Sequence, residues 1–396
     1  MKVRINKENI GILLCYCLIY FGNAKLLFHS MVSAFELAQC VILFLSVAYV
    51  AKYRTRSIGV PSVDVILFFV FIVTYLVAAS YSPSSIAVKT IITSTVINVV
   101  FIVLVYLIAH EIDIGKFVSF SVIINVLMVC AYLVFNANLI LTYLRLSHRL
   151  ESLSLPNPIW VARFVGDTIL LAWMQYWCTK TKKARKIAII SLIPLLIMLL
   201  ISGSKGPVVA IAIATLYYWV FKTTNSNGKI KLIFGLILLL AVAFCAVTFL
   251  DFSRINGYFR FDSIFDLRRG SRLHSYFYAL AMIPKSIFKG YGLGSWGIMY
   301  YGEDSYYYPH NIVLEILFES GLIAFIPFMV MYIRFFVNNK IKTIPYAYVM
   351  SCMTVYYLVC SLFSGGLMSG NKNVFIFWVV TLTTLKERTQ KYNMYK

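Results

Sequence analysis

Long apolar runs separated by short polar segments make up most of this chain. A helix that crosses a bilayer needs about 20 predominantly apolar residues, and most of the runs approach that length. They cover 9–28, 31–51, 61–80, 87–109, 117–137, 158–178, 187–202, 206–221, 231–250, 311–336, 344–364 and 373–386. The last run is short, and 187–202 with 206–221 is also interpretable as one broken hairpin. The pattern predicts an all-α integral membrane protein with about 12 transmembrane helices, or roughly 10–12.

Composition supports this class. Of the 396 residues, 61% are hydrophobic and only 13% are charged, whereas a soluble domain is about 45–50% apolar and about 25% charged. An ordinary soluble enzyme, a disordered chain and a fibrous repeat are thereby excluded. We expect residues 1–396 to form a single polytopic membrane domain into which one large external loop, 251–310, is inserted.

The net charge of +21 indicates an orientation. Cytoplasmic loops of membrane proteins carry an excess of Lys and Arg. With the N-terminus inside, alternate segments hold 22 of the 36 basic residues, so both termini are predicted to be cytoplasmic. The 251–310 loop is basic and external, but long loops translocate largely regardless of charge. The basic clusters are short and form no soluble domain with interleaved aromatics, which argues against nucleic acid as a partner.

The external loop carries several predicted features. Leu273–Phe288 has the pattern of an amphipathic helix near the membrane surface. Gly290, Gly292 and Gly294 predict a turn where backbone approaches another part of the structure closely. Its aromatic residues are typical of an interfacial belt, with stacking on sugar rings as the alternative; they are Trp296, Tyr300, Tyr301, Tyr306, Tyr307 and Tyr308.

A polar stripe follows this loop. Pro309 favours the first position of a helix, which places Asn311, Glu315 and Glu319 on one face. At 1.5 Å rise per residue the stripe runs about 12 Å into the membrane. Two carboxylates there are costly unless they face protein or a wet cavity. His310 stands at the outer end, where a helix N-terminus also favours an anion, so we predict a functional site here.

Two other places hold candidate cations. In Ile201-Ser-Gly-Ser-Lys-Gly-Pro207, Lys205 and backbone N–H groups can hold an anion, or the segment is an ordinary turn with a snorkelling lysine. Arg163 and Asp167 lie one turn apart, which favours an internal ion pair over a ligand site. The preceding external loop adds two arginines that can reach the same vestibule, Arg145 and Arg149.

Three of these motifs resemble a known family. His310-Asn311, nine residues and Gly321 resemble the H-N-x9-G signature shared by O-antigen ligases and Wzy-type O-antigen polymerases, although Ala324 departs from its usual G-x-x-[G/T/Y] continuation. The Ser-Gly-Ser-Lys205-Gly hairpin is similar to the family's S-R-G element, with Lys in place of Arg. The segment Arg269-Gly-Ser-Arg272-Leu, followed by Pro284 and the Gly290–Gly294 turn, resembles the family's S-x-R…P…G-x-G-x-G run. The resemblance covers roughly 150–325.

The resemblance implies a multi-helix membrane glycosyltransferase with a helical periplasmic loop and no cofactor. A polymerase of this kind joins undecaprenyl-pyrophosphate-linked repeat units into O-antigen or capsular polysaccharide on the outer face of the bacterial inner membrane. In the family, the counterparts of Arg272 and Lys205 engage the pyrophosphate, and the counterpart of His310 is implicated in activating the acceptor hydroxyl. The implied partners are the lipid-linked donor and acceptor, the bilayer and a chain-length regulator protein.

The residues support this chemistry by themselves. Transfer from a pyrophosphate needs positive charge on the leaving group and a base for the acceptor. Arg272 presents a bidentate fork to phosphate, His310 can act as the base, and Glu315 would orient the imidazole or bind sugar hydroxyls. No acidic residue stands at metal-ligand spacing from His310 in this run, so transfer is predicted to need no metal. The binding candidates are Lys205, Arg269, Arg163, Arg149 and Asn311.

Two alternatives remain open at this level. An O-antigen ligase transfers finished glycan from undecaprenyl pyrophosphate to lipid A core, and the motifs do not separate it from a polymerase. A flippase or transporter for lipid-linked glycan would predict internal repeats and charged midplane residues on several helices, for which Glu36, Asp64 and Lys89 are the candidates.

Overall fold

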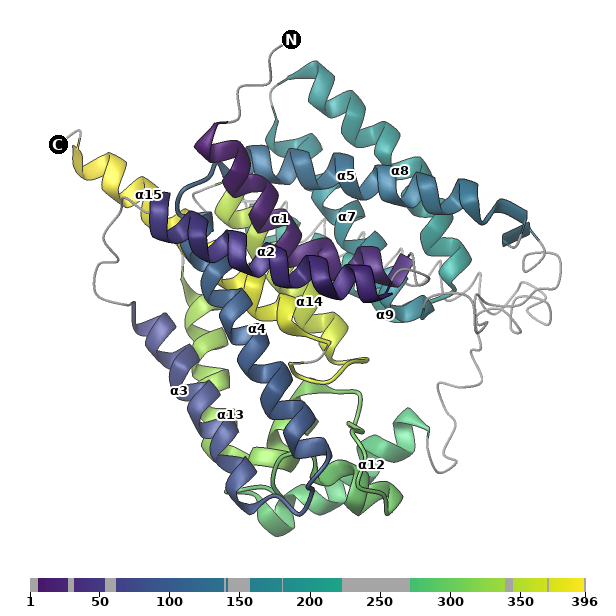
Figure 1. The fold of residues 1–396 in the computed structure, drawn as a ribbon, viewed down its shortest axis with the longest axis vertical. Helices are drawn as coiled ribbons and strands as arrows, with labels where there is room; N and C mark the ends of the chain where they lie inside the picture. The colour runs from purple at the N-terminus through teal and green to yellow at the C-terminus, as the bar shows by residue number, and fades with distance from the viewer. Residues whose placement is uncertain are drawn as a thin grey trace.

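A computed structural model of the protein describes residues 6–27, 32–53, 62–138, 140–141, 157–179, 181–222, 271–338, 345–368 and 370–394. Every regular element within these ranges is helical (Figure 1). The all-α class that the apolar runs predict is therefore confirmed.

The helices match the apolar runs closely. In chain order they are α1 (Lys7–Leu27), α2 (Val32–Tyr53), α3 (Val63–Val77), η2 (Ala78–Tyr81), α4 (Ala87–Ala109), α5 (Ile114–Phe135), α7 (Pro158–Cys178), α8 (Lys182–Ser202), α9 (Lys205–Lys222), α12 (Arg272–Met282), η4 (Ile283–Ser286), η5 (Gly297–Tyr301), α13 (Ile312–Val337), α14 (Pro345–Ser361) and α15 (Lys372–Met394). Eleven of the twelve runs coincide with a helix. The remaining run, 231–250, lies outside the described residues.

Among the described residues, six segments are long and apolar enough to cross a membrane. They are Glu36–Tyr53, Val63–Tyr81, Ala87–Ala109, Ile114–Phe135, Lys182–Ser202 and Ile312–Val337. Three shorter apolar helices accompany them, Lys205–Val220, Tyr346–Ser361 and Lys372–Thr384. The protein is thus a multi-pass integral membrane protein. A total of about 12 spans, and the compartment that each end faces, stay predictions.

The turn between α8 and α9 does not make a hairpin. Gly203 ends α8 in a left-handed conformation with φ 60°. Helix α8 packs against α7 and α5, whereas α9 packs against α14 and α7. The two helices diverge from the turn, so the interpretation of 187–202 and 206–221 as one broken hairpin is wrong.

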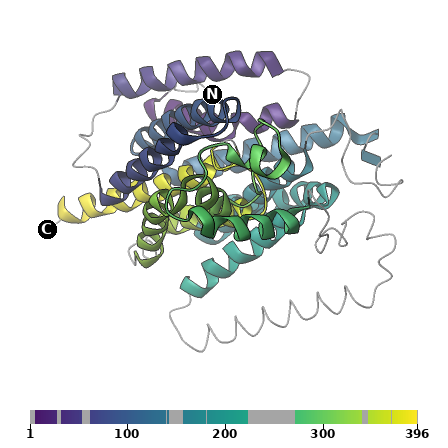
Figure 2. The same cartoon turned by 90° about the horizontal axis from the view of Figure 1, so that it is seen from below.

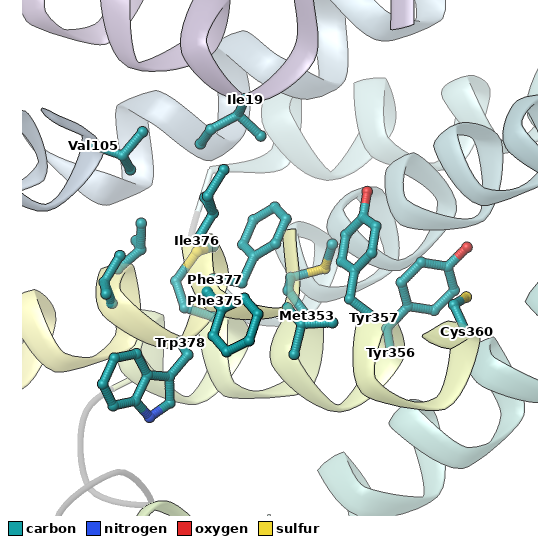
Figure 3. Close-up of a cluster of buried hydrophobic side chains, with 14 of the residues drawn as sticks. Ile19, Val105, Met353, Tyr356, Tyr357, Cys360, Phe375, Ile376, Phe377 and Trp378 are labelled. Atoms are coloured by element: carbon teal, nitrogen blue, oxygen red, sulfur yellow. The ribbon is translucent and has the colours of Figure 1, made fainter. Parts of the chain in front are cut away.

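The apolar first part of α15, Lys372–Thr384, crosses the centre of the bundle, and the C-terminal end of the helix projects outwards (Figures 1 and 2). Its side chains Phe375 and Trp378 are fully buried, and both contact the ring of Phe68 from α3, with centroids 5.5 and 5.9 Å away. Figure 3 shows Ile19 of α1 and Val105 of α4 on the other side of α15. Every side chain from Val374 to Thr384 is buried, as expected for a segment that is apolar almost all round and must be enclosed by other helices.

Three ion pairs gather at the end of the bundle opposite to α12. They are Lys7–Glu111 at 3.0 Å, Lys116–Glu8 at 2.9 Å and Arg334–Asp64 at 3.0 Å. They link the first turn of α1 to the end of α4 and to the first turn of α5, and the first turn of α3 to the end of α13. Their three basic members are predicted to share the cytoplasmic side, and the structure places them at a common end. Asp64, a charge that the flippase alternative needs at the midplane, lies at this end too.

The opposite end is held by contacts between the α3–α4 turn and the segment before α13. The Asp304 carboxylate accepts hydrogen bonds from Ser84 Oγ at 2.5 Å and from Ser85 N and Oγ at 2.9 Å each. These bonds hold the pKa of Asp304 well below its usual range. Ser82 Oγ also donates to the Leu293 carbonyl at 2.5 Å. Asp304 therefore caps α4 from a segment far away in sequence.

Helix α13 is interrupted at Gly321, where φ is 61° and ψ is −162°. The backbone groups freed there bond to the 287–292 segment: Tyr291 N to Phe318 O at 2.8 Å, Gly292 N to Glu319 O at 2.9 Å, Leu322 N to Ile287 O at 2.8 Å and Ile323 N to Phe288 O at 3.2 Å. A Cβ at Gly290 would lie 2.5 Å from the Glu319 carbonyl carbon. The predicted close approach of the glycine turn is thus confirmed, and what it approaches is α13.

The amphipathic helix predicted over Leu273–Phe288 is shorter than expected. The α-helix ends at Met282 and is followed by the single turn η4. Pro284 has no N–H with which to continue the helical ladder. Phe277 and Leu280 on α12 are 56% and 55% exposed, in keeping with a position near the membrane surface.

Candidate functional site

The site forms at the start of α13. Asn311 is the N-cap, and its Oδ1 accepts hydrogen bonds from Val313 N at 3.0 Å and Leu314 N at 3.2 Å. The helix therefore begins at Ile312 rather than at Pro309, because the Asn311 side chain satisfies N–H groups that the first turn leaves free. The amide oxygen of Asn311 is engaged in capping, and its binding of substrate stays a prediction.

His310 precedes this cap in a strained conformation. Alone among the described non-glycine residues, it has a positive φ, of 59°, which costs roughly 1–2 kcal/mol for a residue with a Cβ. Tyr276 Oη donates to its carbonyl at 3.3 Å, and the Tyr308 ring lies edge-on at 4.8 Å. Its buried Nδ1 has no hydrogen-bond partner. Strain and an unpaired buried nitrogen are both common at functional sites, and a functional role for His310 stays a prediction.

Two arginines act electrostatically on His310. Burial first, and then the positive charges of Arg272 and Arg163, lower its pKa to about 4. The imidazole is therefore neutral at pH 7. Burial, together with the charge of Arg163, lowers the pKa of Arg272 as well, although tyrosines oppose this. The Arg272 side chain is nevertheless exposed, so it has protein on several sides and still meets solvent. The structure thus brings His310, Arg272 and Arg163 within range of one another's charges.

Arg163 is held almost entirely by neutral groups. It is 3% exposed and projects from α7, which begins after the N-cap Asn157. Nη1 donates to Asn371 Oδ1 at 2.9 Å, and Nη2 donates to the carbonyls of Cys360 at 2.5 Å and Ser364 at 2.6 Å. The guanidinium also lies 4.8 Å from the Trp160 ring centroid. No carboxylate among the described residues neutralises it, so its charge remains available to attract an anion.

The ion pair expected between Arg163 and Asp167 does not form. Asp167 is fully buried and accepts hydrogen bonds from Tyr20 Oη at 2.9 Å and Tyr357 Oη at 2.5 Å. The spacing of one turn puts both residues on neighbouring parts of α7. Each side chain instead reaches a different neighbour, because tertiary contacts supply closer partners.

The segment 361–371, which runs from the last residue of α14 to α15 and is described except at position 369, is a part of the candidate site that the sequence analysis missed. Its Leu362 carbonyl accepts from Tyr276 Oη at 3.1 Å, and its Met368 carbonyl accepts from Asn98 Nδ2 at 2.5 Å. Asn98 lies midway along α4, which places this irregular backbone at membrane depth. Such backbone is tolerated where protein satisfies it. In the sequence, this irregular segment is indicated by two tripeptides, Ser-Gly-Gly and Ser-Gly-Asn, which stand between two short apolar runs.

Glu315 holds the same segment. Its two carboxylate oxygens accept from Leu367 N at 2.9 and 3.0 Å, and the residue is 1% exposed. Because His310 Nδ1 has no partner, Glu315 does not orient the imidazole through that nitrogen. Glu319 accepts from Gly294 N at 3.0 Å and from Tyr75 Oη at 3.4 Å. Both carboxylates face protein, as their cost in a membrane requires.

Of the remaining candidate cations, the structure describes Lys205 only. Lys205 begins α9, and a Cβ at the next residue, Gly206, would lie 3.4 Å from Phe363 Cβ. The Lys205 turn therefore packs against the 361–371 segment, which Arg163 and Tyr276 also contact. The other predicted arginines, Arg269, Arg149 and Arg145, lie outside the described residues.

The loop aromatics do not all form an interfacial belt. Trp296 is fully buried and Tyr300 is 3% exposed. Their rings stack at 4.9 Å, and Phe318 of α13 meets Trp296 at 4.9 Å. Both predicted roles, the belt and the sugar platform, are wrong for these two residues, because they pack a small core between α12 and α13. Tyr307, by contrast, is 39% exposed.

No group of three or more His, Cys, Asp or Glu side chains within the described ranges is arranged to hold a metal ion. Metal independence stays a prediction.

Comparison with known families identifies residues 190–329 as a match to the Wzy_C family, described as O-Antigen ligase. The resemblance predicted from three motifs is confirmed over this stretch, which includes Lys205, Arg272, His310 and Glu315. Members of the family are membrane enzymes that transfer glycans. Arg163 and the 361–371 segment lie outside the match. No curated protein matches the chain.

Proposed function

We propose that this protein, whose residues 190–329 carry the O-antigen ligase family domain, is a repeat-unit polymerase. It joins undecaprenyl-pyrophosphate-linked oligosaccharides into O-antigen or capsular polysaccharide on the outer face of a bacterial inner membrane. The observation that supports this most is the grouping of His310, with its unpaired buried Nδ1, beside the exposed Arg272 and the uncompensated Arg163.

In the proposed reaction the acceptor hydroxyl attacks the anomeric carbon of the donor sugar. The bond from that carbon to the pyrophosphate oxygen breaks, and undecaprenyl pyrophosphate leaves with the electron pair. Arg272 is exposed and can bond two phosphate oxygens at once. Arg163, fixed by the 361–371 segment, adds a buried positive charge whose effect on the leaving group is strengthened by the surrounding protein. Lys205, at the start of α9, also binds the pyrophosphate.

His310 receives the hydroxyl proton at Nδ1, the nitrogen that lacks a partner. With its pKa lowered to about 4, the free imidazole is a weak base. The positive charges of Arg272 and Arg163 cause part of this lowering of the His310 pKa. A bound pyrophosphate carries negative charge and therefore counteracts their effect. Binding of the donor therefore raises the pKa of His310 towards neutrality, where a general base works best. The base becomes effective when the leaving group is in place.

The direct test is elongation of a purified lipid-linked repeat unit by the reconstituted full chain. His310→Asn removes the base but keeps a side chain that tolerates positive φ, and Arg272→Ala removes the exposed cation. Lys285→Ala is the matched control, because Lys285 is an exposed cation of the same loop whose ammonium group contacts Met282 Sδ at 3.6 Å. We expect the first two variants to lose elongation by at least about 100-fold and the control to keep it. Elongation by His310→Asn and Arg272→Ala at the control's rate would disprove the site.

A ligase is the second candidate, favoured by the description of the matched family. A deletion strain separates the two reactions. One repeat unit on the core oligosaccharide indicates loss of a polymerase. Bare core, with lipid-linked polymer accumulating, indicates loss of a ligase.

A further inference from the structure

A groove of about 270 Å³ opens between α7 and α8, which pack closely along each other (Figure 1). It is lined by Ala172, Trp173, Tyr176 and Trp177 of α7 and by Ala188, Ile189 and Leu192 of α8. Small residues at Ala172 and Ala188 create the space, and three aromatic rings form one wall. The groove is therefore apolar in its depth.

A cluster of cations directly precedes the groove-lining residues of α8 in the chain. It consists of Lys182, Lys183, Arg185 and Lys186 in the first turns of α8, and all four are exposed. None of them forms an ion pair with a described residue. Arg185 is fixed in place, because its Nε donates to the Thr179 carbonyl at 3.1 Å and its guanidinium lies 5.8 Å from the Tyr176 ring centroid.

One polar atom in the groove wall lacks a partner. The indole N–H of Trp173 is buried and makes no hydrogen bond, and a buried unpaired donor costs about 1–3 kcal/mol. An interfacial belt tryptophan normally directs its N–H to water or head groups. A ligand with a hydrogen-bond acceptor between its charged and apolar parts would satisfy this donor.

We propose that the α7–α8 groove is a binding site for one anionic phospholipid. Its phosphate lies against the Lys182–Lys186 cluster, its ester carbonyl accepts from the Trp173 indole, and part of one acyl chain fills the space between the aromatic wall and Leu192. The charge of the cluster selects an anionic head group over a zwitterionic one. Basic pockets between membrane helices are suited to such lipids.

This site is separate from the glycan-transfer site. Trp173 and Arg163 lie ten residues apart on α7, which corresponds to about 15 Å along the helix. The lipid would therefore come from the leaflet on the side away from His310, which is the cytoplasmic leaflet in the predicted orientation. The four cations belong to the set that the topology rule places there.

Native mass spectrometry of the purified full chain with equal amounts of phosphatidylglycerol and phosphatidylcholine tests the proposal. We expect one phosphatidylglycerol to be retained with at least tenfold preference. Leu192→Trp fills the groove and should lower that retention at least tenfold. Ile193→Trp is the matched control, since Ile193 is 62% exposed and does not line the groove. Arg185→Gln, which removes the cation that contacts the Tyr176 ring, should weaken retention roughly fivefold.

A second measurement does not depend on the folding of a groove variant. Phosphatidylglycerol with brominated acyl chains should quench the tryptophan fluorescence of the wild type more than brominated phosphatidylcholine does. Replacing both tryptophans of the groove wall, Trp173→Phe with Trp177→Phe, should remove most of that difference. Equal retention of the two lipids, equal quenching by them, or retention by Leu192→Trp that matches Ile193→Trp would each overturn the proposal.

Discussion

Replacing Gly321 by alanine tests whether the last residue of the H-N-x9-G signature acts through structure. Its φ of 61° and ψ of −162° lie in a region that essentially only glycine adopts. A Cβ there would lie 2.3 Å from the Phe288 carbonyl oxygen and 2.7 Å from Gly290 N. Gly302 provides the matched control, because its φ is also positive, at 82°, but nothing lies within 4 Å of its Cβ position.

The loss of stability in Gly321→Ala follows from these contacts. Alanine in the Gly321 conformation is strained by about 1–3 kcal/mol. Relieving the clash moves the 287–290 backbone away and should break two or three of the four hydrogen bonds that join the 287–292 segment to α13, at about 1 kcal/mol each. Gly321→Ala should therefore destabilise the protein by about 3–6 kcal/mol. Gly302→Ala should cost only the left-handed strain, about 1–2 kcal/mol.

Thermal unfolding of the purified variants in one detergent measures the difference. For a chain of this length, 1 kcal/mol shifts the unfolding midpoint by about 1 °C. We expect a fall of about 3–7 °C for Gly321→Ala and about 1–2 °C for Gly302→Ala. Because the 287–294 turn also carries the contact to Glu319, elongation should fall in Gly321→Ala alone. Equal midpoints for the two variants would refute the reasoning.

Four other predictions concern the site. The acid limb of the pH profile of kcat/KM, which reports the free enzyme, should lie near pH 4, where His310 titrates. The acid limb of the kcat profile, which reports the enzyme with donor bound, should lie at higher pH. If both acid limbs lay at the same pH, the proposed activation of His310 by the donor would be contradicted. Glu315→Gln keeps an acceptor for Leu367 N and should retain elongation, whereas Glu315→Ala should lose it; if the Gln variant were as inactive as the Ala variant, the carboxylate would act in catalysis. Arg163→Gln should reduce elongation at least tenfold and Asp167→Asn should not, because the two residues are not paired; equal losses would argue for a shared role. Asp304 has a lowered pKa, so its stabilisation is present above the unfolded pKa of about 4 and is lost as the pH falls. Asp304→Asn should abolish that part of the acid sensitivity of the unfolding midpoint, and an unchanged pH profile would count against the cap.

Residue pairs on α7 and α13 show what helical spacing predicts correctly and what it does not. The i, i+4 spacing correctly predicted that Glu315 and Glu319 would share an inward face, since helical periodicity sets direction. The same spacing predicted an ion pair for Arg163 and Asp167, which is wrong. Side-chain partners depend on what packs opposite, and here α1, α14 and the 361–371 segment supply them.

The local motifs were informative where they encode backbone conformation. Gly290, Gly292 and Gly294 all have positive φ, as a glycine-rich turn predicts. Their partner, the interrupted turn of α13, is 30 residues away in the chain and could not be read from either motif. Trp296 and Tyr300 looked like surface aromatics because composition does not show whether a loop packs a core of its own.

The sequence by itself determined the membrane class, the boundaries of most helices, the resemblance of residues 190–329 to the O-antigen ligase family and the candidates His310, Arg272 and Glu315. Apolar length and helical period are local properties, and a short motif preserves local chemistry. Only the tertiary structure decided that Arg163 lacks an acidic partner, that Glu315 holds the 361–371 segment, and that this segment borders the site. Those facts depend on contacts between α7, α13 and the α14–α15 connection, which lie far apart in the chain and are brought together only when the bundle folds.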